Sequence, residues 1–249
     1  MKATIKHKSN LYKINLAEPL DISIPIRDGS KNVNAWYIGP PEIQPEVFEG
    51  DTISVSEGAS VNFNTIKFNP HAHGTHTETA GHVLEKKYSI NKKLKQFFFL
   101  AELITVAPEK FMDDMIISKK QLEFALKGKD LDALVLRTIP NTKEKKTRQY
   151  SYTNWPYFKE DAIEFLVKRG IKHLLIDLPS VDRERDGGEL ASHHAFWNTD
   201  GKVREDATIT EFIYVSNKIK DGSYFLNLQI APFHNDATPS KPILYKILE

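Results

Sequence analysis

The amino-acid sequence predicts a mixed α/β or α+β fold in one domain that spans residues 1–249. Two observations predict the fold class: strands and amphipathic helices alternate in the middle of the chain, and extended segments dominate both flanking parts. A third observation predicts the single domain, because no internal repeat and no low-complexity tract divides the chain.

The first part of the chain is predicted to be mainly extended. Residues 20–26 alternate apolar and polar side chains, as a half-buried strand does, and Pro25 favours an edge or an irregular end. Residues 28–50 are rich in Gly, Pro and Asn, which is typical of a long loop. Residues 97–106 have the apolar character of a buried strand.

The middle of the chain predicts a strand, a crossover helix and a second strand. Ser118 can cap a first helix that Gly128 ends, and residues 133–136 follow as a short buried strand. The next helix is predicted from four apolar residues that share one helical face: Phe158, Ala162, Phe165 and Leu166. Residues 173–178 form the second buried strand, which completes a βαβ unit. Three more strands are predicted at residues 212–215, 224–230 and 243–248.

Composition excludes several classes of protein. Lys and Arg total 34 against 33 Asp and Glu, and this balance argues against a dedicated nucleic-acid binder. The chain has no Cys, so a metal ion would have to be held by His, Asp or Glu. No apolar run approaches the length of a membrane span, and no apolar segment follows the charged start. We therefore expect a soluble, cytoplasmic protein.

Four of the nine histidines lie within twelve positions, between His71 and His82. Neutral imidazoles and carboxylates suit Zn²⁺, Mn²⁺ or Fe²⁺. In an extended backbone His76 and Glu78 share one face, and a turn could bring His82 back to them. Taken alone, this segment fits an exposed histidine-rich loop as well as it fits a metal site, but the Glu inside the cluster favours the site.

A second group of polar residues follows the strand at 173–178. Chemically capable residues beyond the carboxyl end of a buried strand are typical of α/β sites. Most of the acids between Asp182 and Glu189 are expected to form a solvated face. His193 and His194 are adjacent, so at most one should point inward. Glu211 precedes an apolar stretch, and its position alone gives it no claim on a metal.

These residues resemble the metal-dependent cyclase family, which includes bacterial kynurenine formamidase and isatin hydrolase. The family's motif is His-x-Gly-Thr-His-x-Asp-x-Pro-x-His, and residues 74–82 match its body as Gly-Thr-His-x-Glu-x-x-x-His. Further similar segments follow in the family's order: the strand at 20–26, Leu136-Arg137-Thr138, Gly170 to Asp182, His193-x-x-Phe196-Trp197 and Glu211. The resemblance covers the chain from about residue 20 to its end.

The resemblance implies a swivelling β/β/α fold, a homo-oligomer (a homodimer or homotetramer), and one or two divalent ions, Zn²⁺ or Mn²⁺. It implies that His76 and Glu78 are metal ligands, with Glu78 in place of the family's bridging Asp. His193 and Glu211 would complete a second metal position, and His82 would be the general acid and base.

The chain departs from the family's motif at three positions. The family's first His aligns with Ala72, and His71 and His73 flank it. Either neighbour needs a bend to reach the metal. We prefer His71, because Pro70 interrupts regular pairing, and His73 is the alternative. Glu78 is one methylene longer than the family's Asp, and Ala80 replaces its Pro.

The resemblance implies a metal-dependent hydrolase that cleaves a C–N amide bond of an aryl formamide or a cyclic amide. His82 would take a proton from water and return it to the leaving nitrogen. Two alternatives use the same residues: a non-catalytic relative that binds a small molecule, and a metal-assisted lyase or dehydratase. The larger aromatic residues favour core or interface positions over a substrate pocket: Trp36, Tyr37, Trp155 and Trp197.

Overall fold

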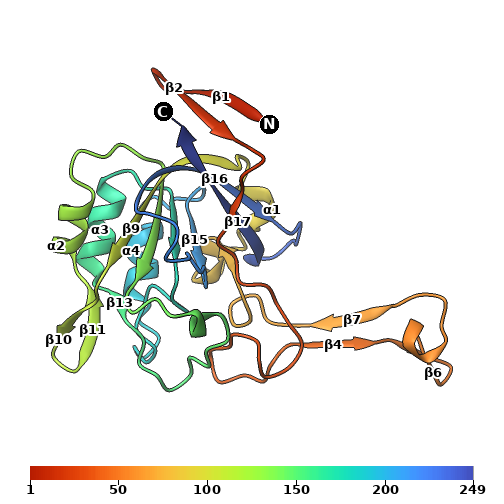
Figure 1. The fold of residues 1–249 in the computed structure, drawn as a ribbon. Coiled ribbons are helices and arrows are strands. Elements are labelled where there is room, and N and C mark those ends of the chain that lie inside the picture. Colours follow the sequence, from red (N-terminus) through yellow and green to blue (C-terminus); the bar gives the residue numbers. More distant parts are fainter. Residues whose placement is uncertain (249) are drawn as a thin grey trace.

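The computed structural model describes residues 1–248 (Figure 1). Its largest sheet contains ten strands, and seven of them close on themselves in the order β17-β16-β9-β12-β14-β15-β8 within the described residues. The closure arises because β8 pairs with both β15 and β17. The mixed α/β class that the sequence predicts is confirmed.

The strands of the main sheet are β1 (Lys2–His7), β2 (Asn10–Asn15), β3 (Leu20–Asp21), β8 (His76–Glu78), β9 (Phe98–Val106), β12 (Ala133–Thr138), β14 (His173–Ile176), β15 (Thr208–Glu211), β16 (Gly222–Ile230) and β17 (Ala237–Leu248). Smaller sheets contain β4 (Glu42–Pro45) with β7 (Asn64–Lys67), β5 (Val47–Phe48) with β6 (Asp51–Thr52), and β10 (Glu109–Phe111) with β11 (Asp114–Ile117) and β13 (Tyr157–Phe158). The helices are η1 (Val55–Glu57), η2 (Ala80–His82), α1 (Ile90–Lys93), α2 (Lys119–Ala125), η3 (Lys143–Lys146), α3 (Glu160–Lys168) and α4 (Ala191–Trp197).

Strands β9, β12, β14 and β15 run parallel, and α3 connects β12 to β14. The predicted βαβ unit is therefore present. Successive residues of β12 alternate between two cores, as the pleat requires. Leu134 and Leu136 join the core shared with α2, α3 and α4, whereas Ala133 and Val135 face the other core. The three helices lie together on one face of the sheet (Figure 1).

Several predicted boundaries were wrong. Only Leu20–Asp21 of the strand expected at 20–26 pairs, and the rest, which contains Pro25, has no regular structure. Phe158 ends β13 and precedes helix α3. The strand expected at 212–215 is not formed there. The strand lies at Thr208–Glu211, and it ends before 212 because the backbone of Phe212 is left-handed (φ 54°). Glu211 is thus the last residue of a strand, not the residue before one.

Residues 42–67, expected in part as loop, form an extended arm that leaves the body of the protein (Figure 1). The arm consists of β4 paired with β7 and the small β5–β6 hairpin. None of the helices among residues 1–248 is both long enough and apolar enough to cross a membrane.

Candidate metal centre

Strand β8 begins in a segment that permits little variation. A Cβ on Gly74 would lie 3.1 Å from the carbonyl oxygen of Ile24, so any other residue there would push the neighbouring backbone away. The Thr75 hydroxyl accepts the backbone N–H of Ile24 at 2.7 Å and donates to the carbonyl of Phe212. Gly74 and Thr75 therefore fix the start of β8 against two neighbouring segments. From there the strand pairs with β15 and β17.

The floor of the site comes from the pairing of β8 with β15. His76 is the cross-strand partner of Glu211, and cross-strand neighbours have adjacent side chains. His76 Nε2 lies 3.3 Å from Glu211 Oε2. Glu78 is fully buried two residues further on the same face of β8. The register of one antiparallel pair thus brings one imidazole and two carboxylates together.

Helix α4 contributes a second imidazole from the opposite side. His193 Nε2 lies 3.2 Å from Glu78 Oε1, and its other ring nitrogen, Nδ1, lies 2.5 Å from Asp182 Oδ2. Asp182 also accepts the backbone N–H groups of Ser192 and His193, which hold the helix start in place. His194, the adjacent residue, instead contacts the Thr199 hydroxyl. One histidine of the pair faces the site, as predicted.

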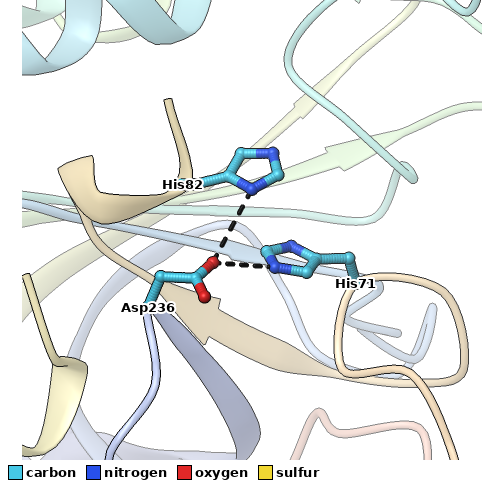
Figure 2. Close-up of side chains that lie close together, drawn as sticks. All are labelled: His71, His82 and Asp236. Atoms are coloured by element: carbon cyan, nitrogen blue, oxygen red, sulfur yellow. Dashed lines mark hydrogen bonds and ion pairs between the residues drawn. The ribbon is translucent and has the colours of Figure 1, made fainter. Parts of the chain in front are cut away.

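The rim of the site is formed by turns rather than strands. His71 lies in the turn after Pro70, with Nδ1 3.0 Å from Glu78 Oε2 and Nε2 2.9 Å from Asp236 Oδ2. His82 ends the helical turn η2, and its ring stacks on that of His71 with the centroids 4.2 Å apart. Figure 2 shows both imidazoles directed toward Asp236.

His73 is directed away from this group. Its Nδ1 accepts the backbone N–H of Asn69, and its Nε2 donates to the carbonyl of Gly39. Of the two candidates for the first histidine, His71 is the one that contacts Glu78.

The donor atoms at this site fit a divalent cation. Four buried atoms converge here and, although they lie close to one another, none makes a hydrogen bond of suitable geometry: His71 Nδ1, His76 Nε2, Glu78 Oε2 and Glu211 Oε1. Buried polar atoms are normally paired, so four unpaired atoms in one place indicate a missing partner. With neutral imidazoles, Glu78 and Glu211 would leave two buried negative charges, which are costly unless a cation offsets them.

The site also shifts the pKa values of its groups. Burial opposes the charged form of His71, but the carboxylates of Asp236 and Glu78 raise its pKa to about 10. Burial works to raise the pKa of Glu78, yet the imidazoles of His82, His193 and His71 hold it well below its usual value. For Glu211, burial and the charge of Glu78 raise the pKa. Since metal ligation needs neutral imidazoles, a cation that binds here replaces protons.

A cavity of about 270 Å³ opens over these groups. Its lining residues are Trp36, Ile38, Asn69, His71, His82, Ser180, Leu190, His193 and Glu211. Trp36 therefore lines the cavity, whereas Trp155 and Trp197 belong to the buried cores, and the Tyr37 hydroxyl donates to Glu184. A lining that combines apolar side chains with a few polar groups is typical of a small-molecule site.

Comparison with known proteins identifies the family. The Cyclase family model matches residues 20–183, which is more than half of the chain. This protein belongs to the Cyclase family. A kynurenine formamidase from Bacillus cereus is 27% identical over 236 residues, which cover 93% of this chain and 99% of the relative.

Solved structures share the Cyclase fold. A structure described as a potential metal-dependent hydrolase with cyclase activity aligns with a TM-score of 0.66 at 18% identity, over 92% of this chain and 97% of the other. Isatin hydrolase A from Labrenzia aggregata aligns with a TM-score of 0.64 at 12% identity, over 92% and 93% of the two chains. The family resemblance that the sequence predicts is confirmed.

Within this Cyclase-family structure, all six proposed site residues come together: His71, His76, Glu78, His82, His193 and Glu211. Their roles as ligands or catalyst stay predictions. Two acids were missed. Asp182 belongs to the run of acids that was expected to be mostly solvated, but it is buried against His193, and only its place in the family's segment marked it. Asp236 was not considered, since it lies outside every recognised motif.

Proposed function

We propose that this protein is a metal-dependent hydrolase that cleaves the C–N bond of an amide, either an aryl formamide or a cyclic amide. The observation that carries the proposal is the convergence of unpaired buried imidazole and carboxylate atoms beneath a cavity with a free imidazole, His82, at its rim. Relatives named kynurenine formamidase and fold neighbours named isatin hydrolase support the same reaction class. The chain is thus a hydrolytic enzyme of the Cyclase family.

The residues divide naturally between two metal positions. We assign His71, His76 and one oxygen of Glu78 to the first position, since their ligand atoms lie within 4.8 Å of one another. The other oxygen of Glu78, with His193 and Glu211, faces the second position. Imidazole and carboxylate donors suit Zn²⁺ or Mn²⁺. A divalent ion held there supplies Lewis acidity, which polarises a carbonyl and makes water more acidic.

His82 carries the proton in the proposed reaction. Its side chain is 29% exposed at the cavity rim, and its Nδ1 lies 3.9 Å from Glu78 Oε2. The ring accepts a proton from the attacking water as the new C–O bond forms, and it returns that proton to nitrogen as the C–N bond breaks. Trp36, Ile38 and Leu190 offer the apolar wall against which an aryl group packs.

The reaction is tested with one probe of each amide class, formanilide and isatin. We expect the purified protein to hydrolyse at least one of them, to lose the activity on chelation, and to regain it with Zn²⁺ or Mn²⁺. In ¹⁸O water the label should enter the new carboxylate. Turnover without that label would indicate a lyase, and binding without turnover by the metal-loaded protein would indicate a non-catalytic binding protein.

We also propose that the protein forms the predicted homodimer or homotetramer, and that the arm at residues 42–67 lies in the interface. Large apolar side chains on the arm are more than half exposed: Val47, Phe48, Val55, Val61, Phe63 and Ile66. None of the buried clusters among residues 1–248 contains an arm residue. Such an isolated hairpin is marginally stable in water, and exposed apolar surface of this extent marks an interaction site.

Charge favours a second copy of the chain as the partner of the arm. The arm contains five acidic residues and one basic residue, although the whole chain has a net charge of +1. The body is therefore positively charged and complements the arm of another copy. The two ends of the arm join the body close in sequence to Ile38 and Asn69, which line the cavity. Assembly through the arm would therefore also cover the entrance to the site. A small-molecule substrate and a cytoplasmic location stay predictions from the sequence.

Sedimentation velocity of matched variants tests the assembly. Phe48→Asp places a charge on the arm, whereas Phe124→Asp places the same charge on α2, where the side chain is 88% exposed. We expect Phe48→Asp to shift the protein to a smaller species and Phe124→Asp to leave the assembly unchanged. A monomeric wild-type protein, or equal behaviour of the two variants, would contradict the proposal.

A further inference from the structure

Asp236 holds a fixed position at the rim of the site. It immediately precedes β17, whose first residue, Ala237, is the cross-strand partner of Glu78. The Asp236 carbonyl accepts the backbone N–H of Thr79 at 3.1 Å. A Cβ placed on Gly81 would lie 3.2 Å from the Cβ of Asp236. The backbone at the exit of β8 therefore determines where this carboxylate lies, and the carboxylate points to the two rim imidazoles (Figure 2).

The His71 ring lies between two carboxylates, one at each nitrogen. Nε2 is 2.9 Å from Asp236 Oδ2, and Nδ1 is 3.0 Å from Glu78 Oε2. The two aspartate contacts at the rim are not equivalent. The distance to His71 is that of a hydrogen bond, whereas His82 Nδ1 lies 3.7 Å from the same oxygen, which is too long for one.

The His193 side of the site is built in the same way from different elements. There Asp182 contacts Nδ1, and Nε2 faces the other oxygen of Glu78. The two rings thus present opposite nitrogens to one shared carboxylate, and an aspartate lies against the far nitrogen of each ring. A carboxylate at the far nitrogen is the usual means by which proteins orient a metal-ligating histidine.

We propose that Asp236 is a positioning residue for the metal centre: it accepts the Nε2–H of His71 and so keeps the lone pair of Nδ1 directed at the cation position beside Glu78. The inference rests on the proposed function, because it assigns His71 as a ligand. Asp236 is not assigned as a ligand of the cation beside Glu78, since its oxygen contacts Nε2 of His71 whereas Glu78 faces Nδ1. Its effect is expected in metal affinity, before any substrate binds.

The test measures the affinity of metal-depleted protein for Zn²⁺ by competition with a chromophoric chelator. Asp236→Asn keeps an acceptor oxygen but loses the charge, and Asp236→Ala loses both. We expect Kd to rise about 10-fold for Asn and about 100-fold for Ala. Asp21→Asn is the matched control, because Asp21 pairs with Lys241 on the same strand β17 and lies outside the cluster; its Kd should equal that of the wild type.

A double-mutant cycle separates positioning from a general structural effect. If Asp236 acts through His71, Asp236→Ala should weaken Zn²⁺ binding far less in a His71→Ala background than in the wild type. A shifted Co²⁺ absorption spectrum in Asp236→Asn, with unchanged circular dichroism, would support the same conclusion. Equal losses in both backgrounds, or unchanged affinity with a reduced kcat, would overturn it.

The outcomes also distinguish this inference from the proposed reaction. A wild-type protein that binds Zn²⁺ but hydrolyses neither amide probe would contradict the reaction and leave the role of Asp236 intact. A wild-type protein that binds neither Zn²⁺ nor Mn²⁺ would overturn both.

Discussion

The two ends of the parallel strand pair β14 and β15 hold buried imidazoles in opposite surroundings. At the starting end, His173 faces the Thr208 hydroxyl and the ring of Phe99, and burial lowers its pKa to about 3. At the carboxyl end, burial also disfavours the charged form of His193, but Asp182 and Glu78 raise its pKa well above the usual value.

The difference shows that burial alone does not make a histidine functional. Both rings are almost fully buried, His173 on strand β14 and His193 on helix α4, yet only the carboxyl end combines imidazoles with Glu78 and Glu211. Buried carboxylates need a positive partner, so that end alone can hold a cation. This agrees with the general placement of α/β sites beyond the carboxyl ends of parallel strands.

The largest expected effect comes from removing the charge that distinguishes the carboxyl end. Glu78→Gln is nearly isosteric, but it cannot offer an anionic oxygen to both proposed metal positions. We expect metal content after purification to fall close to zero and kcat/KM to fall by about 10³-fold or more, since Lewis acidity contributes several kcal/mol. Elemental analysis and amide hydrolysis measure the two effects.

Glu102→Gln is the matched control for that change. Glu102 is buried and contacts Lys129 and Ser223, outside the site. Its variant should retain bound metal. If Glu78→Gln retained metal as well as the control does, the two ends of β14 and β15 would not differ in the way described.

The next effect separates the rim from the floor of the site. His82→Ala removes the proposed proton carrier but leaves His71, His76 and Glu78 in place, so kcat should fall by about 10²- to 10⁴-fold while metal content is retained. His194→Ala, a change in a histidine that contacts Thr199, is the control. Loss of metal from His82→Ala would make His82 a ligand instead.

The sequence predicted those parts of the fold whose signals are local. Helix α2 begins after Ser118, whose backbone N–H donates to the Gln121 side chain, and β12, α3 and β14 follow from periodicity and apolar runs. The strand misplaced at 212–215 shows the limit. Residues 212–215 are as buried as Thr208–Glu211, and the end of β15 depends on the backbone of Phe212, whose carbonyl accepts the distant Thr75 hydroxyl.

The site shows the same division between local and distant information. Alternation along β8 was enough to place His76 and Glu78 on the same face of the strand. Pro70 was enough to favour His71 over His73. Asp236 is 158 positions beyond Glu78, and it reaches the site only because β8 pairs with β17 in one register. No periodic pattern in the sequence encodes that pairing, so a sequence search for ligands could not have found this residue.

The smallest expected effect concerns the starting end of the strand pair. His173 has a pKa near 3 when folded, against an ordinary value of 6.5, so between these values the unfolded chain binds a proton that the folded protein does not. Above pH 6.5 this residue therefore costs the folded protein no stability, and the loss that it causes grows as the pH falls below 6.5. Between pH 7 and pH 5 this residue should lower the free energy of unfolding by about 2 kcal/mol.

Urea unfolding of metal-depleted protein at the two pH values measures that loss. Between pH 7 and pH 5 the free energy of unfolding of His173→Gln should fall by about 2 kcal/mol less than that of the wild type. Gln keeps a polar side chain near Thr208 but does not titrate. His234→Gln, in an exposed loop, is the control and should retain the full loss. If His173→Gln lost as much stability as the wild type, the acid sensitivity would arise elsewhere, and the burial of the neutral His173 ring would not be its cause.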